Sequence, residues 1–420
     1  MTLKFIVFIG FTFSLTTVFS QAKVDSLLNV GNKLYKNKEF DKAASIWETA
    51  ASLTENKLAK NTNYSYAASA FASAKDSTNS FKCLELAVYK FGYNDIPELT
   101  NDDSYEFMKS SQRWKDLLKF IKPTYSTDPK KIKIIDSDVR NFWFANDLVQ
   151  KDTINAERIY MDEYINKGTM ALQFYYLNKI GTIENFVYMH NLRKNYYKSI
   201  RKNTLNLQQQ KSSYQKSFLN LKKIYPEAIF PPIYFVIGKL NSAGTKSSEG
   251  LILAIDQACM SSNVDTTELS NWEKNNISTF QNLPNTVAHE LIHFQQDGMV
   301  SDTTLLKAAI VEGMADFIGE LISGKSANEK LLIYGKGKEK IIWEDFKKEM
   351  FLKRGYKWIA NGGRTDLGDK PSDLGYWVGY QICKAYYEQA QDKRKAIYEM
   401  LHIQDYKKFH EQSKIEEKFK

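Results

Sequence analysis

The sequence contains very little cysteine. Its 420 residues include only three, Cys83, Cys259 and Cys383. An odd number of widely separated cysteines is not the disulfide framework that small exported domains use. We therefore interpret all three as small buried residues and not as metal ligands. A hydrophobic core must then hold the fold, and a chain of this length with 43% hydrophobic residues is long enough to bury one.

Long apolar runs are absent beyond the first twenty residues. At the N-terminus Lys4 precedes the apolar run Phe5–Phe19, and Val18-Phe19-Ser20 supplies small residues at the two positions that a signal peptidase reads, before Gln21. This pattern predicts a secretory signal peptide at residues 1–20, because the run is shorter than the ~20 residues that span a bilayer. No cysteine lies near the cut, so we do not expect a lipid anchor. The mature chain is expected to be exported, periplasmic or extracellular, and without a transmembrane segment.

Arginine-rich stripes and nucleic-acid-binding motifs are also absent. The formal net charge is +9, but the lysines are scattered along predicted helical faces. This distribution is typical of a solvated basic surface, and it predicts no nucleic-acid partner.

Residues 21–124 are predicted to form a helical domain. Small and large packing residues recur 37 positions apart, as Gly31, Trp47 and Ala50 and then Ala68, Leu84 and Ala87. The pattern resembles tetratricopeptide repeats with a slightly long period. Two degenerate repeats are few, so a plain helical domain with chance alanine spacing is the alternative. The repeats imply a docking surface for a protein partner within residues 24–122.

Residues 132–420 are predicted to form a second domain after the connector Tyr125–Lys131. Residues 135–225 show helical spacing, with aromatic residues in the core. Two β-rich runs follow, Ile233–Ile237 and Leu251–Ile255, which we expect to be adjacent strands separated by a glycine-bearing loop. Further helices are predicted from Pro284 to Asp297 and at 303–323, 340–353 and 375–402. The fold class is therefore mostly α with a small β-sheet (α+β).

The pentapeptide His289-Glu290-Leu291-Ile292-His293 contains two candidate zinc ligands and a candidate catalytic base. Histidines at i and i+4 lie one turn apart on one helix face, so both can reach the same Zn²⁺. Glu290 can then act as the base that takes a proton from a zinc-activated water. With 5 histidines in the chain, chance would produce this pattern in only about 0.4% of such sequences. The alternative, an amphipathic helix with surface histidines, is therefore poor.

A third ligand is expected at Glu312. The segment Glu312-Gly313-Met314-Ala315-Asp316 resembles the second motif of thermolysin-like peptidases, in which a ligand glutamate is followed four residues later by an aspartate. The resemblance implies that Glu312 completes the zinc site. It also implies that Asp316 accepts a hydrogen bond from the outer nitrogen of His289. Ordinary surface carboxylates are the alternative for both residues.

The second domain also resembles a family of exported, predicted Zn-dependent proteases known as a domain of unknown function. The resemblance spans about Ile135 to Leu401. It is carried by Tyr225-Pro226-Glu227-Ala228, Tyr234-Phe235-Val236-Ile237-Gly238, Gly250-Leu251-Ile252-Leu253, the His-Glu helix and Leu374-Gly375-Tyr376-Trp377-Val378-Gly379-Tyr380. The implied zincin architecture places Leu251, Ile252 and Leu253 on a strand at the cleft edge, where an extended peptide can add by main-chain hydrogen bonds. A gliding-motility lipoprotein family is similar more distantly, and this chain lacks its lipidation cysteine.

The group that stabilises the developing oxyanion is sought among tyrosines and histidines beyond the ligands. Tyr376 is our choice, with Tyr380 behind it, because Tyr376 follows a glycine-rich loop at the head of a predicted helix. A packing role for Tyr376 is the alternative. His402 and His410 lie in a charged C-terminal stretch and are expected to be solvated.

Two functions from different classes follow. The first is an exported zinc metallopeptidase that hydrolyses peptide or protein substrates. The second is a catalytically weak or inactive zincin-fold scaffold of the cell envelope that binds partners through its helical repeats. The presence of Glu290, the candidate base, favours the enzyme. The scaffold stays the alternative because no single residue is marked by the sequence as the oxyanion donor.

Overall fold

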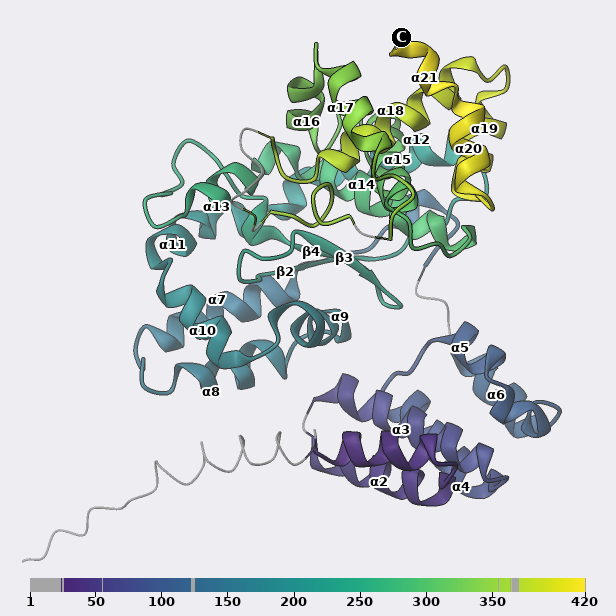
Figure 1. Cartoon of the computed structure of the whole chain (residues 1–420). Coiled ribbons are helices and arrows are strands. Elements are labelled where there is room, and N and C mark those ends of the chain that lie inside the picture. The colour runs from purple at the N-terminus through teal and green to yellow at the C-terminus, as the bar shows by residue number, and fades with distance from the viewer. Residues whose placement is uncertain are drawn as a thin grey trace, which may run out of the picture. The chain divides into compact units, whose positions relative to one another are not determined.

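The structure, a computed structural model, describes residues 24–419 except 25, 55, 122–124, 354, 363 and 365–369 (Figure 1). The predicted signal peptide, residues 1–20, lies outside the described residues. The described chain is mostly helical with one small sheet, so the predicted α+β class is confirmed.

The chain forms two compact units whose boundaries differ in part from the predicted domains. The first unit joins the described residues before Pro123 to Phe144–Asn178, and the second joins Thr124–Trp143 to the rest of the chain. The first break coincides with the predicted connector. The predicted domain of residues 132–420 is interrupted, however, because residues 144–178 pack with the N-terminal helices. There the backbone N–H of Leu58 donates to Gln173 Oε1 at 3.1 Å, a long-range contact that no sequence pattern announces.

The described part of the first unit is helical. Residues 26–36 are helical. The following elements are α2 (Phe40–Leu53), α3 (Lys57–Ser73), α4 (Ser77–Glu85), η1 (Leu86–Lys90), α5 (Ile96–Asn101), η2 (Asp103–Met108), α6 (Gln112–Phe120), α8 (Ala156–Tyr160), η4 (Met161–Ile165) and α9 (Met170–Tyr175). Asn56 and Asp76 begin α3 and α4 by accepting hydrogen bonds from the backbone N–H groups of Ala59 and Asn79, as N-cap residues do.

The repeated small and large residues of this unit do pack as expected. Trp47, Ala68, Leu84 and Ala87 are buried in one core cluster. Gly31 is small because a β-carbon there would lie 2.6 Å from Trp47 Nε1. The three cysteines are buried and free, as predicted.

The sheet of the second unit contains β1 (Ile134–Ile135), β2 (Ile233–Val236), β3 (Gly244–Ser247) and β4 (Gly250–Ala254). Its order is β1-β2-β4-β3 in the described residues. β2 and β4 are adjacent, as expected for these two runs. They are parallel, and Ile233 is in register with Leu251. The glycine-bearing segment between them was expected to be a loop, but its middle forms β3, antiparallel to β4.

The predicted edge strand is therefore wrong. Leu251, Ile252 and Leu253 lie on β4, which is paired on both sides and fully buried. The edge strands of the described sheet are β1 and β3. β3 is the one that packs against α14, and its residues, Gly-Thr-Lys-Ser, are partly to fully exposed. An edge strand of this kind carries no apolar alternation, so hydrophobic periodicity cannot reveal it.

The second unit also contains helices. They are α7 (Ser137–Val149), which spans the boundary of the two units, α10 (Ile183–Asn191), α11 (Lys194–Thr204), α12 (Lys211–Ile224), α13 (Asn271–Asn276), α14 (Leu283–Gln295), α15 (Leu305–Ser323), α16 (Glu329–Gly335), α17 (Glu339–Lys347), α18 (Leu374–Gln389), α19 (Lys393–Leu401), α20 (Tyr406–Ser413) and α21 (Ile415–Lys418). Short helical turns η3 (Pro129–Lys131), η5 (Tyr176–Ile180), η6 (Leu207–Gln210), η7 (Ile255–Gln257), η8 (Phe280–Asn282) and η9 (Gln296–Gly298) connect them.

The C-terminal part differs from the prediction in two ways. The predicted helix at 375–402 is divided into α18 and α19, because Asp392 caps a new helix by accepting from the backbone N–H of Arg394 at 2.9 Å. His410 is buried on α20 and stacks on Trp343, with 5.5 Å between ring centroids. The expectation that His410 is solvated is therefore wrong. His402 is partly exposed and stacks on Tyr398.

Three helices position the candidate site. α14 packs against β3 and β4 on one side and against α15 on the other, and α15 also packs against α18. Two glycines allow α15 and α18 to touch backbone to backbone. A β-carbon on Gly313 would lie 2.0 Å from the Tyr380 nitrogen, and one on Gly379 would lie 1.7 Å from the Ala309 oxygen. This close crossing brings the first turn of α18 beside Glu312.

Candidate metal centre

α14 presents both histidines of the pentapeptide on one face. Pro284 begins the helix at a position where no backbone N–H is required. Val287 and Leu291 bury the opposite face completely. His289 and His293 follow one another by one turn, with their ring centroids 4.7 Å apart. The buried back of the helix fixes the direction of the two imidazoles.

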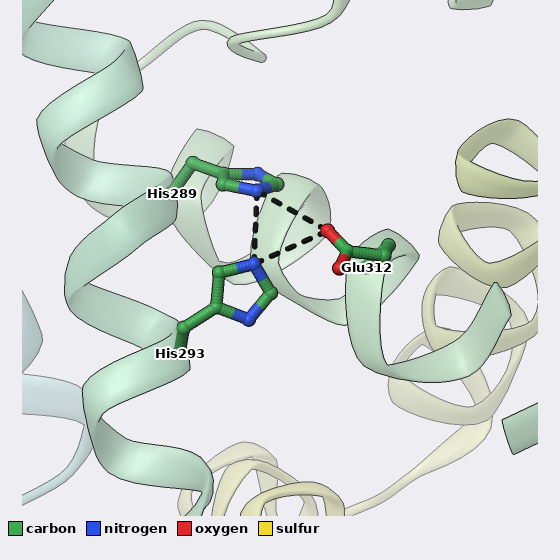
Figure 2. A group of neighbouring side chains, drawn as sticks. All are labelled: His289, His293 and Glu312. Atoms are coloured by element: carbon green, nitrogen blue, oxygen red, sulfur yellow. Dashed lines mark hydrogen bonds and ion pairs between the residues drawn. The ribbon is translucent and has the colours of Figure 1, made fainter. Parts of the chain in front are cut away.

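Glu312 comes from the facing helix, α15, and meets both imidazoles (Figure 2). His293 Nε2 lies 3.1 Å from His289 Nε2 and 3.2 Å from Glu312 Oε2. His289 Nε2 lies 3.5 Å from the same carboxylate oxygen. The three predicted ligands are thus brought together on two neighbouring helices, with one atom of each pointing to a common centre.

These distances fit a tetrahedral zinc ion. With Zn–N and Zn–O distances of about 2.0–2.1 Å, the ligand atoms at the corners of a tetrahedron are about 3.3 Å apart. The observed separations of 3.1, 3.2 and 3.5 Å bracket this value. Two histidines and one glutamate fill three corners, and the fourth stays open for a water molecule or substrate, which is the pattern of catalytic zinc sites.

The outer nitrogens of both rings are held by hydrogen-bond acceptors. His289 Nδ1 lies 2.9 Å from Asp316 Oδ1, the expected contact. His293 Nδ1 lies 2.8 Å from Gln296 Oε1, while the Gln296 amide nitrogen donates to the Val311 oxygen at 2.9 Å. A carboxylate can only accept, and the amide group of Gln296 is oriented by Val311, so both Nδ1 atoms must donate. Both Nε2 atoms then face the common centre together with a carboxylate oxygen, an arrangement that could hold a metal ion.

Two supporting residues were not predicted. Gln296 lies three residues after His293 on the same helical turn, so its spacing offered a signal. Asn328 donates to both oxygens of Asp316, at 3.0 and 3.1 Å, from the loop after α15. Nothing in the local sequence marks Asn328, because its role depends on where that loop returns. Hydrogen bonds of this kind orient metal ligands and sustain their affinity.

When no metal ion is bound, burial and neighbouring charges shift the pKa values of the three candidate ligands in opposite directions. Burial disfavours the imidazolium form of His289, but Asp316 and Glu312 outweigh burial and raise the pKa of His289 well above its usual value. The pKa of His293 is raised in the same way, against burial, by Glu312. Burial alone would raise the pKa of Glu312, but the two histidines hold it far below its usual range. Without a metal ion, protons therefore take the place of the cation.

Glu290 lies on the side of α14 that faces β3. A β-carbon on Gly244, the first residue of β3, would lie 2.5 Å from Glu290 Oε1. Glycine at this position thus leaves room for the Glu290 carboxylate between the edge strand and the histidines. On the same strand, Lys246 Nζ donates to the His293 carbonyl oxygen at 3.1 Å. β3 is therefore attached to the helix that carries the ligands.

Tyr376 and Tyr380 have different surroundings. The Tyr376 ring is parallel to His289, with 6.1 Å between centroids. Burial raises the pKa of Tyr376 well above its usual value, and the neighbouring Glu312 raises it further. The Tyr376 hydroxyl therefore stays protonated at neutral pH and can donate. Tyr380 is not among the residues that line the cleft with Glu312, and its hydroxyl donates to Glu320 at 2.8 Å.

One cleft of about 460 Å³ contains the predicted residues. Its lining includes all three ligands together with Glu290 and Tyr376. Gly244, Thr245 and Lys246 of β3 form part of its wall, whereas Leu251, Ile252 and Leu253 do not line it. The cleft also contains Lys307 and Tyr406, which the sequence analysis did not single out. The arrangement can hold a metal ion, a base and a hydroxyl donor beside an edge strand.

The fold and the site define a mostly helical α+β protein with a His-His-Glu cluster able to hold a metal ion. The chain belongs to the family of the gliding motility protein GldB, whose model matches residues 121–416. From the sequence we expected the resemblance to this family to be more distant than the resemblance to predicted zinc proteases. The family's description says nothing about zinc or proteolysis, so the second resemblance stays a prediction. No curated protein and no solved structure matches the chain significantly.

The family is one of lipoproteins, which are exported proteins, so the match agrees with the expected export. Among the residues that the structure describes, no helix has the length and apolar character needed to cross a membrane. The gliding-motility description of the family agrees with a possible protein partner for this chain.

Proposed function

We propose that this protein is an exported zinc-dependent peptidase. The observation that carries the proposal is the convergence of His289 Nε2, His293 Nε2 and Glu312 Oε2 within 3.1 to 3.5 Å, with both outer ring nitrogens already engaged. Three lone pairs in this arrangement repel one another unless a cation lies between them. Nitrogen and carboxylate ligands in a tetrahedral set favour Zn²⁺ over Mg²⁺ or Ca²⁺, which prefer oxygen ligands.

His289, His293 and Glu312 would hold the zinc ion. Zinc supplies Lewis acidity there, which polarises a carbonyl and lowers the pKa of water from about 15.7 toward about 7. Glu290 receives the proton of the attacking water and delivers it to the leaving amine. Tyr376 donates a hydrogen bond to the oxygen of the scissile carbonyl as negative charge develops on it. Asp316 and Gln296 keep the two rings in the tautomer that leaves Nε2 unprotonated.

The substrate is proposed to bind along β3. β3 is one edge of the described sheet, and its outer side is not paired with another described strand. An extended peptide can add to such an edge by main-chain hydrogen bonds, which suits cleavage of unstructured segments of many sequences. Gly244 then places the scissile bond next to Glu290, since these two residues lie against one another. The substrate strand is therefore reassigned from β4 to β3.

A site of action outside the cytoplasm is part of the proposal. The lipoprotein description of the family and the predicted signal peptide both support export. Whether the protein acts in the periplasm or outside the cell is decided by fractionation. The family's description also supports a connection with gliding motility, in which peptidase activity would process an envelope protein.

The test is metal analysis followed by hydrolysis of a mixed peptide pool by the full-length mature protein. We expect close to one zinc per chain and cleavage that a chelator abolishes and added zinc restores. Glu290→Gln should retain zinc but cleave about 10²–10⁴-fold more slowly, because the amide cannot accept a proton. If Glu290→Gln cleaves at the wild-type rate, Glu290 is not the base. A folded, zinc-loaded protein that cleaves nothing would instead favour an envelope scaffold.

A further inference from the structure

A second hollow lies in the helical unit, and the proposed peptidase chemistry makes no use of it. It has a volume of about 320 Å³, and its walls come from the helical residues 26–36, from α2 and α3, and from residues 93–105. A neighbouring hollow is lined by Asp95, Pro97, Glu98, Asn101 and Asp102, so the two share Glu98 and Asp102. We call the two together the acidic hollow.

Aromatic rings form one wall of the acidic hollow. Trp47 lies between Tyr35 and Tyr66, with 5.5 Å between its ring centroid and each of theirs. Trp47 is buried, whereas Tyr66 is 43% exposed and brings the row of rings to the surface. The faces of such rings attract a cation that is partly removed from water.

Carboxylates form the other wall and are held in place by hydroxyl groups. The Tyr93 hydroxyl donates to Glu98 at 2.6 Å, and the Ser69 hydroxyl donates to Asp102 at 2.7 Å. Asp102 also accepts from the backbone N–H of Ser104 at 2.8 Å, which starts η2. These neutral donors orient the carboxylates without cancelling their charge.

The charge of the acidic hollow is opposite to that of the whole chain. Asp95, Glu98 and Asp102 line it, and the described lining contains no lysine, arginine or histidine. The chain as a whole has a formal net charge of +9. A concave surface with one sign of charge and apolar walls concentrates ligands of the opposite sign. The charge of this hollow and its rings are complementary to a cation that also has a flat or apolar part.

We infer that the acidic hollow binds an arginine side chain of a protein partner. A guanidinium group is planar, stacks on aromatic faces and donates several hydrogen bonds to carboxylates in fixed directions. A volume of about 320 Å³ is at the small end of ligand pockets, so it admits a side chain and not a folded element. The exposed Tyr66 ring at the rim provides apolar contact for the residues next to that arginine. This inference is independent of the proposed peptidase function.

The experiment measures binding of a fluorescein-labelled Gly/Ser peptide with one central arginine to the full-length mature protein, by fluorescence anisotropy at low salt. The control probe contains citrulline, which has the shape of arginine but no charge. We expect the arginine peptide to bind at least about tenfold more tightly than the citrulline peptide, the factor that one charge-assisted hydrogen bond provides. Added salt should weaken binding of the arginine peptide more than binding of the citrulline peptide.

Two double variants distinguish the acidic hollow from long-range charge. Glu98→Gln with Asp102→Asn removes two charges from its lining. The amide oxygens at positions 98 and 102 can still accept from Tyr93 and from the Ser104 backbone N–H, and the Ser69 hydroxyl can accept from the amide nitrogen at position 102. Asp103→Asn with Glu106→Gln removes two charges from exposed positions on η2 that do not line it. We expect the first double variant to bind the arginine peptide at least about tenfold more weakly than the wild type. The second double variant should change that affinity by less than about twofold. Thermal unfolding checks that both variants are folded.

Three results would overturn the inference. Equal affinity for the arginine and citrulline peptides would show that no cation is recognised. Equal weakening by both double variants would show only a diffuse charge effect. Free arginine or spermidine that competes as well, per mole, as the peptide would show a site for small cations and not for a protein partner. Because zinc is not involved, the measurement is repeated with chelator, and its outcome does not depend on whether the protein is a peptidase.

Discussion

The candidate metal-site cleft and the acidic hollow both combine carboxylates with aromatic rings, but we propose different cations for them. In the cleft, a carboxylate from α15 meets two imidazoles from α14, and the nearest ligand atoms are 3.1 Å apart. In the acidic hollow, Glu98 and Asp102 face tyrosine and serine hydroxyls, and no imidazole lines it. One site therefore offers converging lone pairs, and the other offers separated charges beside flat apolar surfaces.

The difference shows how the same side-chain types acquire different ligands through geometry. A dehydrated metal ion needs several donors at about 2 Å from one point, which only convergent, oriented groups can supply. An organic cation is larger, keeps its hydrogen atoms and is recognised over several ångströms by charge and stacking. Supporting hydrogen bonds follow the same division. Asp316 and Gln296 act on metal ligands, whereas Tyr93 and Ser69 only orient carboxylates.

The largest expected effect is loss of zinc from the cleft with no change at the acidic hollow. His289→Ala and His293→Ala each remove one of three ligands, so the purified protein should lose its zinc. Glu312→Ala should weaken zinc binding strongly for the same reason. Glu98→Gln with Asp102→Asn should keep the full zinc content. Metal analysis of the four proteins decides this. Full zinc in a histidine variant would mean that zinc binds elsewhere.

A smaller effect is expected when a hydroxyl group is removed near the ligands. Tyr376→Phe should lower kcat by up to about 10²–10³-fold while zinc content stays the same, because a donor to the developing oxyanion acts in the transition state. Tyr380→Phe is the matched control, since that hydroxyl donates to Glu320 away from the cleft. Steady-state kinetics with one cleaved peptide compares them. Equal kcat values for the two variants would assign Tyr376 a packing role.

Groups that hold the outer ring nitrogens should have a still smaller effect, visible in zinc affinity. Asp316→Ala should weaken zinc binding about 10–100-fold, as the loss of a ligand's hydrogen-bond partner does. Asn328→Ala should weaken it less, because Asn328 acts only through Asp316. Competition with a fluorescent chelator measures both affinities. Unchanged affinity in Asp316→Ala would contradict the hydrogen bond to His289 as a source of metal affinity.

The smallest effect concerns pH. In the metal-free protein the pKa values of His289 and His293 are raised, so their stabilising contribution is present below about pH 6.5, the unfolded value, and is lost as pH rises through the folded values. Zinc must displace these protons, so zinc binding should release protons, and the affinity for zinc should increase with pH. Calorimetry in two buffers with different ionisation enthalpies measures the release. The double variant of the acidic hollow should release the same number of protons.

The sequence by itself was enough to predict a helix that carries Glu290 and presents both histidines on one face. The reason is that i and i+4 spacing on a helix is a local property. It also indicated the mostly helical class, the two buried strands and the small and large residues around Trp47, all of which depend on periodic burial. Motif resemblance led to Glu312 and Asp316, whereas Tyr376 was chosen for its place after a glycine-rich loop at the head of a helix. Glu312 and Tyr376 line the cleft, and Asp316 contacts His289.

Only the tertiary structure decided the rest. β3 lies at an edge of the sheet, and β4 does not, because β4 is paired with both β2 and β3. The sequence Gly-Thr-Lys-Ser has no apolar pattern from which its pairing with β4 could be predicted. Asn328 reaches Asp316 because a loop returns to α15, and residues 144–178 join the first unit through contacts with α3. The acidic hollow needs residues from helices distant in the sequence. Spacing along one helix reports on neighbours within a few residues, whereas these features depend on segments that meet only after folding.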